Sequence, residues 1–360
     1  MNTRVATVHN DLETVLSPPD VAAGQARTSR CLPSPAELRR ELALPEPVIA
    51  QIHAHRQAVR DVIHGRDERL LVIVGPCSLH DAHAALAYGR RLAALADQLG
   101  DRLLIVMRAY VEKPRTTVGW KGLMHDPGLD DGQNLAGGLR AARALLVELA
   151  QLGLPVASEI LTPTAASYIE DTLSWAAIGA RTTESQTHRE TVSGLAMPVG
   201  FKNGTDGDVA SARDALRAAA HAHVHMGIDD AGRAAAIHTP GNPDTHVILR
   251  GGRTGANCDA VSVAGAVRTL QAARLNPRLI IDCSHANSGK DPSRQPAILA
   301  DIFARRRDGE QAIAGVMIES HLNSGNQPIS SALHYGVSIT DACLGWAETR
   351  QALVRLAADR

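Results

Sequence analysis

No stretch of this sequence is long and apolar enough to cross a membrane. Its hydrophobic runs fall short of the roughly 20 residues that span a bilayer. The opening residues, MNTRVATVHNDLETVL, contain no basic segment leading into a continuous apolar one. We therefore expect a cytoplasmic protein with no membrane partner.

Paired cysteines and an excess of one charge are also missing. The five cysteines (Cys31, Cys77, Cys258, Cys283 and Cys343) are scattered and form no Cys-x-x-Cys pair, which argues against a disulfide framework or a zinc ribbon. The 37 Lys and Arg residues almost balance the 38 Asp and Glu residues, so the formal net charge is -1. Such a protein has no overall field to attract nucleic acid, and any anionic ligand must be held locally.

Two common nucleotide-binding motifs are absent. No Gly-x-Gly-x-x-Gly follows the first apolar run, which weakens a dinucleotide-binding fold. The Gly-x-x-x-x-Gly-Lys-Ser/Thr pattern of a phosphate-binding loop is missing too, which disfavours nucleotide hydrolysis.

Eight short apolar runs alternate with amphipathic stretches of helical length. This alternation predicts an α/β fold, a (β/α)8 TIM barrel whose parallel strands are buried on both faces, with a doubly wound open sheet as the alternative. The runs cover residues 70–78, 103–111, 155–161, 175–180, 197–204, 246–251, 278–286 and 315–322.

Two segments stand outside this alternation. Residues 1–65 contain two helical patterns introduced by prolines, and we interpret them as an N-terminal extension to a catalytic barrel over 66–360. Residues 221–245, with the turn sequence DDAG between short semi-apolar stretches, predict a β-hairpin inserted between the fifth helix and the sixth strand. Such an insertion more often serves assembly or regulation than chemistry.

Polar side chains follow the predicted strands at their carboxyl ends, where a barrel carries its chemistry. The cations at these exits would converge on one face and bind one or two small molecules that carry phosphate and carboxylate groups. They are Arg108, Lys113, Arg115, Arg181, Lys202 and Arg250.

A second group at the same exits could hold a metal ion. Cys77, His285, Glu319 and Asp341 would offer one thiolate, one imidazole and two carboxylates, a set that suits Mn²⁺, Fe²⁺, Co²⁺ or Zn²⁺. Other roles remain open on spacing alone. Cys77 could be a packed small residue or a nucleophile paired with His285, and Asp341 could cap a helix.

Nine sequence blocks in fixed order resemble the type I class of 3-deoxy-D-arabino-heptulosonate 7-phosphate (DAHP) synthases. The resemblance runs from about residue 30 to the C-terminus. The blocks are GPCSLHD, RAYVEKPRTTVGWKGL, ASEILTP, GARTTESQTHRE, PVGFKNGTDG, HVILRGG, DCSHANSGKD, GVMIESHLNSGNQ and SITDACLGW.

The resemblance implies a metal-dependent condensation of phosphoenolpyruvate with D-erythrose 4-phosphate, the first step of the shikimate pathway. It implies metal ligation by Cys77, His285, Glu319 and Asp341, and it gives Lys113 and Glu159 catalytic roles. It implies that phosphoenolpyruvate binds Arg108, Lys113, Arg181, Lys202, Arg250 and the backbone at Gly179 and Ala180. Erythrose 4-phosphate would lie against Lys113, Pro114, Arg115 and Thr116.

Members of this family are typically inhibited by one aromatic amino acid, bound away from the barrel mouth beside the inserted hairpin. The resemblance places this effector against Leu195, Ala196, His225 and Gly227, with tyrosine favoured and tryptophan next. It also implies a homodimer or homotetramer. The alternatives are a related barrel acting on arabinose 5-phosphate and a non-catalytic barrel, although every expected metal ligand and cation is present.

Overall fold

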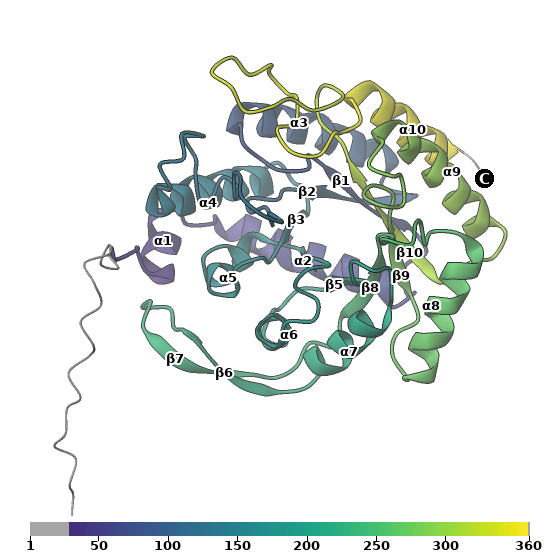
Figure 1. Cartoon of the computed structure of the whole chain (residues 1–360), viewed down its shortest axis with the longest axis horizontal. Coiled ribbons are helices and arrows are strands. Elements are labelled where there is room, and N and C mark those ends of the chain that lie inside the picture. Colours follow the sequence, from purple (N-terminus) through teal and green to yellow (C-terminus); the bar gives the residue numbers. More distant parts are fainter. Residues whose placement is uncertain (1–28, 359–360) are drawn as a thin grey trace, which may run out of the picture. The chain divides into compact units, whose positions relative to one another are not determined.

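A computed structural model describes residues 29–358, and from Pro33 onward the described chain is one compact unit. Eight parallel strands close into a barrel in the order β1-β10-β9-β8-β5-β4-β3-β2 (Figure 1). The strands are β1 (Leu70–Gly75), β2 (Leu103–Arg108), β3 (Val156–Glu159), β4 (Trp175–Ile178), β5 (Val199–Lys202), β8 (Thr245–Leu249), β9 (Leu279–Asp282) and β10 (Ile313–Glu319). The predicted barrel is therefore confirmed, and the open-sheet alternative is wrong.

A helix follows every barrel strand and packs on the outside of the barrel. Three of the longer helices begin at a residue whose side chain accepts a hydrogen bond from the first turn, namely Asp81, Asn134 and Asp259. The helices are α3 (Ala82–Leu99), α4 (Leu135–Gln151), α5 (Pro163–Ile169), α6 (Gln186–Val192), α7 (Ala210–Ala219), α8 (Ala260–Ala272), α9 (Gln295–Arg307) and α10 (Trp346–Ala358), with short 3-10 turns η1 (Glu170–Thr172) and η2 (Pro292–Arg294). No helix within residues 29–358 has the length and apolar character to span a bilayer.

The strands are buried along their whole length, because one face meets the helices and the other fills the barrel. The inward side chains form a separate core around Ile73, Val106 and Trp175. Helix α2 (Glu46–Ile63) contributes Val59, Val62 and Ile63 to that inner core. The helix therefore closes the barrel interior at its amino-terminal end.

The two predicted N-terminal helices are present as α1 (Pro35–Glu41) and α2, while residues 1–28 lie outside the described part. Ser34 and Glu37 form a capping box at the start of α1. The predicted hairpin is also present. Strands β6 (His223–Ile228) and β7 (Ala234–Thr239) pair antiparallel between α7 and β8, and in Figure 1 they curve along the outside of α5 and α6.

Candidate active site

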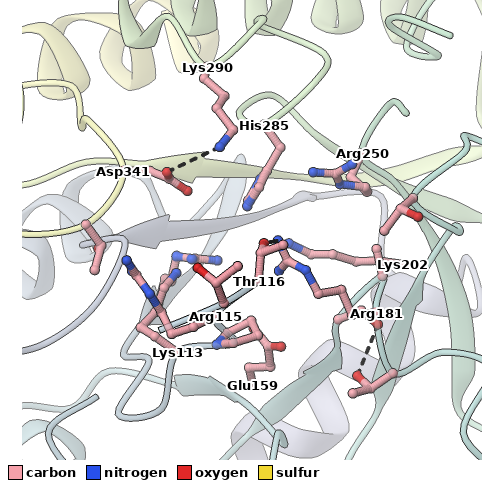
Figure 2. Close-up of a pocket in the computed structure, with 18 of the residues that line it drawn as sticks. Lys113, Arg115, Thr116, Glu159, Arg181, Lys202, Arg250, His285, Lys290 and Asp341 are labelled. Atoms are coloured by element: carbon pink, nitrogen blue, oxygen red, sulfur yellow. Dashed lines mark hydrogen bonds and ion pairs between the residues drawn. The ribbon is translucent and has the colours of Figure 1, made fainter. Parts of the chain in front are cut away.

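A cavity of about 420 Å³ opens at the carboxyl-terminal ends of the strands. Its lining brings together all six predicted cations, from the exits of the four strands β2, β4, β5 and β8, and Figure 2 shows most of them facing one space. The predicted residues in the lining are Arg108, Lys113, Pro114, Arg115, Thr116, Glu159, Gly179, Ala180, Arg181, Lys202, Arg250, His285 and Asp341.

Arg108, the last residue of β2, is fixed deep in this site. Its side chain is 1% exposed, lies 3.6 Å above the Tyr110 ring and donates to Glu319 Oε1 over 2.9 Å. It also donates to the backbone carbonyls of Pro76 and Cys77. Because these contacts fix the guanidinium plane, Arg108 is preorganised to meet a planar anion.

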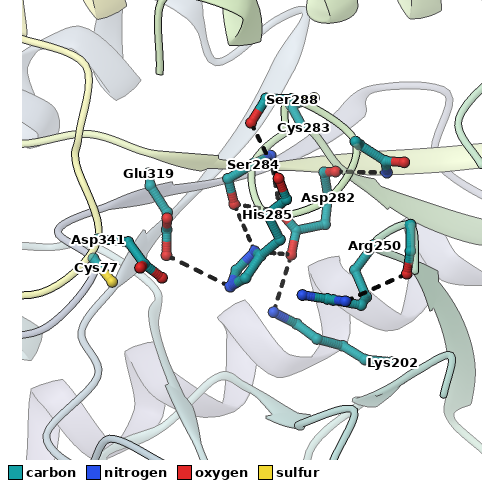
Figure 3. A network of polar contacts seen from close by, with 12 residues as sticks. Cys77, Lys202, Arg250, Asp282, Cys283, Ser284, His285, Ser288, Glu319 and Asp341 are labelled. Atoms are coloured by element: carbon teal, nitrogen blue, oxygen red, sulfur yellow. Dashed lines mark hydrogen bonds and ion pairs between the residues drawn. The ribbon is translucent and has the colours of Figure 1, made fainter. Parts of the chain in front are cut away.

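Three of the four predicted metal ligands form a tight cluster. One ligand atom each from Cys77, Glu319 and Asp341 lies within 4.8 Å of the others. His285 stands next to them, with Nε2 3.9 Å from Glu319 Oε1 (Figure 3). A thiol, an imidazole and two carboxylates at this spacing fit a divalent transition metal.

The Cys77 thiol is fully buried, and its sulfur lies 3.1 Å from Lys113 Nζ. Burial raises the pKa of this thiol, as does the nearby Glu319 carboxylate, whereas Lys113 and Arg108 oppose the increase. The cysteine therefore faces the polar site and is more than a packed small residue. Asp341 does not cap the last helix, because α10 begins at Trp346.

Asp282, the last residue of β9, connects the metal cluster to the cations. Its fully buried carboxylate lies 3.0 Å from Lys202 Nζ and 2.9 Å from His285 Nδ1, and it accepts a further bond from Ser284 Oγ. These partners hold the pKa of Asp282 well below its usual range, although burial alone would raise it. With Nδ1 occupied in this way, Nε2 of His285 is left for the metal cluster.

Glu159 faces the cavity from the end of β3. Its Oε1 is buried and has no hydrogen-bond partner among the described residues. A Cβ at Gly179 would lie only 2.4 Å from this oxygen. Because glycine has no side chain, the Glu159 carboxylate can lie against the end of β4. A buried, unpaired carboxylate oxygen is available to a bound water molecule.

The loop from β2 to α4 carries Lys113 to Thr116 along the cavity rim. Lys113 N donates to Lys121 O, and Thr116 Oγ1 accepts from Arg181 over 2.9 Å. Gly122 has a φ of +111°, and a Cβ there would lie 2.4 Å from Val111 O. The loop therefore folds back on its own start and holds the Lys113–Thr116 segment over the cavity.

Sequence reasoning gave no role to several residues of this site. Lys290 lines the cavity with an Nζ 3.7 Å from Asp341 Oδ1, and its backbone has a positive φ of 64°. Asp282 shares its block with His285, but its link to Lys202 joins strands β9 and β5. Strand β8 lies between β9 and β5, so this contact depends on the closed order of the barrel strands, and no local pattern encodes it.

A second cavity, of about 400 Å³, lies between the hairpin and helices α5 and α6. Leu195, His225 and Gly227 line it, as predicted for an effector site. Ala196 is exposed and outside the lining, where its carbonyl accepts from Arg60. The structure thus brings together three of the four residues expected to bind an effector.

Comparison with known proteins agrees with this geometry. The model of the DAHP synthetase I family matches residues 47–354. The Tyr-sensitive phospho-2-dehydro-3-deoxyheptonate aldolase of Escherichia coli (strain K12) is 52% identical over 327 residues, which are 90% of this chain and 91% of that protein. A Trp-sensitive relative from Enterobacter agglomerans is 49% identical, over 92% of this chain and 97% of that protein.

A solved structure gives the same answer for the fold. The phospho-2-dehydro-3-deoxyheptonate aldolase from Francisella tularensis SCHU S4 superposes with a TM-score of 0.91 at 42% identity, covering 93% of this chain and 98% of that one. The barrel, the cation-lined cavity and these matches over nearly the whole chain lead to one conclusion: the protein belongs to the DAHP synthetase I family.

Proposed function

We propose that the barrel cavity condenses phosphoenolpyruvate with D-erythrose 4-phosphate and water, giving DAHP and inorganic phosphate. This is the first step of the shikimate pathway to chorismate and the aromatic amino acids. The observation that carries the proposal is a cavity lined by six cations together with His285 and Asp341, whose neighbours Glu319 and Cys77 complete a group of four metal-binding side chains. The two substrates bring two phosphates and a carboxylate, whose mutual repulsion these cations offset.

Phosphoenolpyruvate takes the inner part of the cavity. Arg108, Lys202 and Arg250 hold its carboxylate and phosphate there, with Lys113, Arg181 and the backbone at 179–180 completing the site. Erythrose 4-phosphate takes the outer part, where Pro114 and Thr116 place it and Arg115 binds its phosphate. Holding the two reacting carbons close lowers the barrier by an amount that can reach several kcal/mol.

The metal is held by Cys77, His285, Glu319 and Asp341, and Mn²⁺, Fe²⁺, Co²⁺ and Zn²⁺ all suit this donor set. When bound, the ion supplies Lewis-acid activation of the aldehyde. Asp282 positions His285 for this role through its contact with Nδ1.

The remaining chemistry belongs to Lys113 and Glu159. The C2–C3 π electrons of phosphoenolpyruvate form the new bond to the aldehyde carbon, and Lys113 Nζ gives its proton to the developing alkoxide. Glu159 orients the water that adds at C2 and accepts its proton. The C2–O bond to phosphate then breaks while the new C2 hydroxyl passes its proton to the departing phosphate, which releases inorganic phosphate and leaves the C2 ketone.

An aromatic amino acid bound in the second cavity inhibits the enzyme. Tyrosine is favoured, since the relative at 52% identity is named Tyr-sensitive, and tryptophan comes next. The protein works in the cytoplasm as a homodimer or homotetramer, a state that light scattering on the purified protein tests.

The experiment is a product assay with phosphoenolpyruvate and either erythrose 4-phosphate or arabinose 5-phosphate, repeated with each aromatic amino acid. We expect DAHP from the four-carbon aldose and inhibition by tyrosine. Preference for arabinose 5-phosphate would assign the related condensation instead, and no turnover with either aldose would support a non-catalytic barrel. Inhibition by phenylalanine alone would overturn the order of effectors.

A further inference from the structure

The active-site cavity and the second cavity share no lining residue. An effector in the second cavity can therefore change catalysis only through side chains that lie between the two. Glu112 stands in that position, because it immediately precedes Lys113 of the first cavity while its carboxylate reaches the start of α5, which lines the second.

The Glu112 side chain is buried, with 2% of its surface exposed, and its carboxylate contacts Thr162 and His125. Thr162 Oγ1 donates to Oε1 over 2.7 Å, and Thr162 N donates to Oε2 over 3.2 Å. His125 Nε2, from the far side of the β2–α4 loop, lies 3.0 Å from Oε1. The Glu112 carboxylate thus connects three segments. They are the start of the β2–α4 loop, which we call the substrate loop, the later part of that loop at His125, and the start of α5.

Thr162 occupies the N-cap position of α5, where a threonine hydroxyl normally accepts from its own helix. Here the side chain makes no cap bond and donates to Glu112 instead. The next residues, Pro163 and Thr164, line the second cavity. A ligand in the second cavity that displaces the start of α5 therefore also displaces the hydrogen-bond donors of the Glu112 carboxylate.

The other end of this connection reaches the chemistry. Lys113 follows Glu112, and its Nζ lies 3.1 Å from Cys77 Sγ. Arg115 and Thr116 belong to the same loop, on the side proposed for the aldose phosphate. We infer that the Glu112–Thr162 contact transmits occupancy of the second cavity to the substrate loop, so that Glu112 is a positioning residue for Lys113 and Arg115.

A competing route runs through the loop between β4 and α6. Thr182 lines the first cavity and Thr187 the second, and Ser185 Oγ lies 3.0 Å from Thr187 Oγ1. That contact is exposed to solvent, whereas the Glu112 carboxylate is buried and held by several partners. Exposed hydroxyl contacts exchange easily with water and transmit a displacement poorly.

This inference rests on the proposed inhibition by an aromatic amino acid. The test compares wild-type enzyme with Thr162→Val, which removes the hydroxyl donor and keeps the side-chain shape. Thr172→Val is the matched control, because Thr172 Oγ1 donates to Ile169 O at the far end of the same helical segment. Ser185→Ala tests the competing route. L-Tyrosine binding is measured by calorimetry with and without each substrate added alone, so that no turnover occurs, beside steady-state kinetics.

We expect Thr162→Val to bind tyrosine and, in the absence of tyrosine, to keep kcat within about threefold of the wild-type value. In wild-type enzyme a bound substrate should change the tyrosine Kd. In Thr162→Val the ratio of tyrosine Kd values with and without substrate should be at least fivefold closer to one. Thr172→Val should keep the wild-type ratio. Glu112→Gln should also uncouple the cavities and raise KM for erythrose 4-phosphate more than KM for phosphoenolpyruvate.

Two results overturn the inference in distinguishable ways. If wild-type enzyme is inhibited and Thr162→Val shows the same coupling ratio, the contact does not transmit the signal, and a changed ratio in Ser185→Ala would assign the other route. If no aromatic amino acid binds wild-type enzyme, the proposed inhibition fails and the inference fails with it.

Discussion

Cys77 leaves β1 at the point where Gly75 and Pro76 end the strand, and its sulfur joins Glu319 and Asp341 in one cluster. Alanine can replace most of the packing that the buried thiol provides. Without the thiol, however, the two carboxylates and the imidazole lack a strong metal ligand beside them. The role of this residue as a metal ligand is therefore testable apart from stability.

We predict that Cys77→Ala abolishes turnover through loss of metal and leaves the barrel folded. Metal affinity should fall by at least the roughly 10–100-fold seen when even an outer partner of a ligand is removed. Metal content after dialysis, turnover and thermal unfolding check this, with Cys258→Ala as the control because Cys258 is not part of the cluster with Glu319 and Asp341. A variant with full turnover and stoichiometric metal would disprove the assignment.

Asp282 gives a second prediction for a single side chain. Asp282 Oδ2 meets both Lys202 and His285, while Oδ1 accepts from Ser284. Asp282→Asn removes the negative charge and one of these two acceptor oxygens, so metal affinity should fall about 10–100-fold and KM for phosphoenolpyruvate should rise. Titration with Mn²⁺ and steady-state kinetics measure the two effects, with Ser284→Ala as a milder comparison. Unchanged metal affinity and unchanged KM would show that Asp282 serves only the fold.

Among the elements, the β2–α4 loop depends on Gly122, whose positive φ and close approach to Val111 O leave no room for a side chain. Gly122→Ala should therefore displace the Lys113–Thr116 segment. The strain of about 1–3 kcal/mol falls on the loop, so kcat/KM for erythrose 4-phosphate should drop about tenfold or more while the far-ultraviolet circular dichroism stays native. Wild-type kinetics in this variant would show that the loop is not built on this glycine.

The barrel interior predicts a pH effect on stability. His246 of β8 is fully buried and accepts from Trp175 Nε1, and burial lowers its pKa to about 3. In the unfolded chain the ring has an ordinary pKa near 6.5 and takes up a proton below that pH, whereas the folded protein does not. Stability is therefore lost as pH falls from about 6.5 toward 3, by about 2 kcal/mol at pH 5 from this residue.

Urea unfolding at pH 7 and pH 5 measures this loss. His246→Gln keeps an acceptor for Trp175 but does not titrate. The decrease in its free energy of unfolding from pH 7 to pH 5 should therefore be smaller than the decrease in wild type, by about 2 kcal/mol. An identical decrease in wild type and variant would contradict the account.

The elements themselves were readable from the sequence. Strands such as 70–75 and 313–319 are buried on both faces and appear as continuous apolar runs, and DDAG marked the turn of the hairpin. Contacts between elements were not readable. Glu112 meets Thr162 fifty positions away, and α2 fills the barrel floor, because the closed sheet brings those segments together.

At the scale of the whole molecule, near-neutral net charge coexists with a strongly cationic cavity. The barrel achieves this by gathering six cations from four strand exits at one end, with α2 closing the other. The family motifs identified most cavity residues before the structure did, since they mark strand exits. The partners that orient those residues, Asp282 and Tyr110 among them, required the three-dimensional arrangement.

The measurement that tests the central claim most directly is turnover of phosphoenolpyruvate and erythrose 4-phosphate by protein stripped with a strong chelator and then reloaded with Mn²⁺ or Co²⁺. We predict no DAHP formation by the verified metal-free protein and recovery of activity with either ion, because we propose that Cys77, His285, Glu319 and Asp341 hold one. Unaltered turnover by verified metal-free protein would contradict the account.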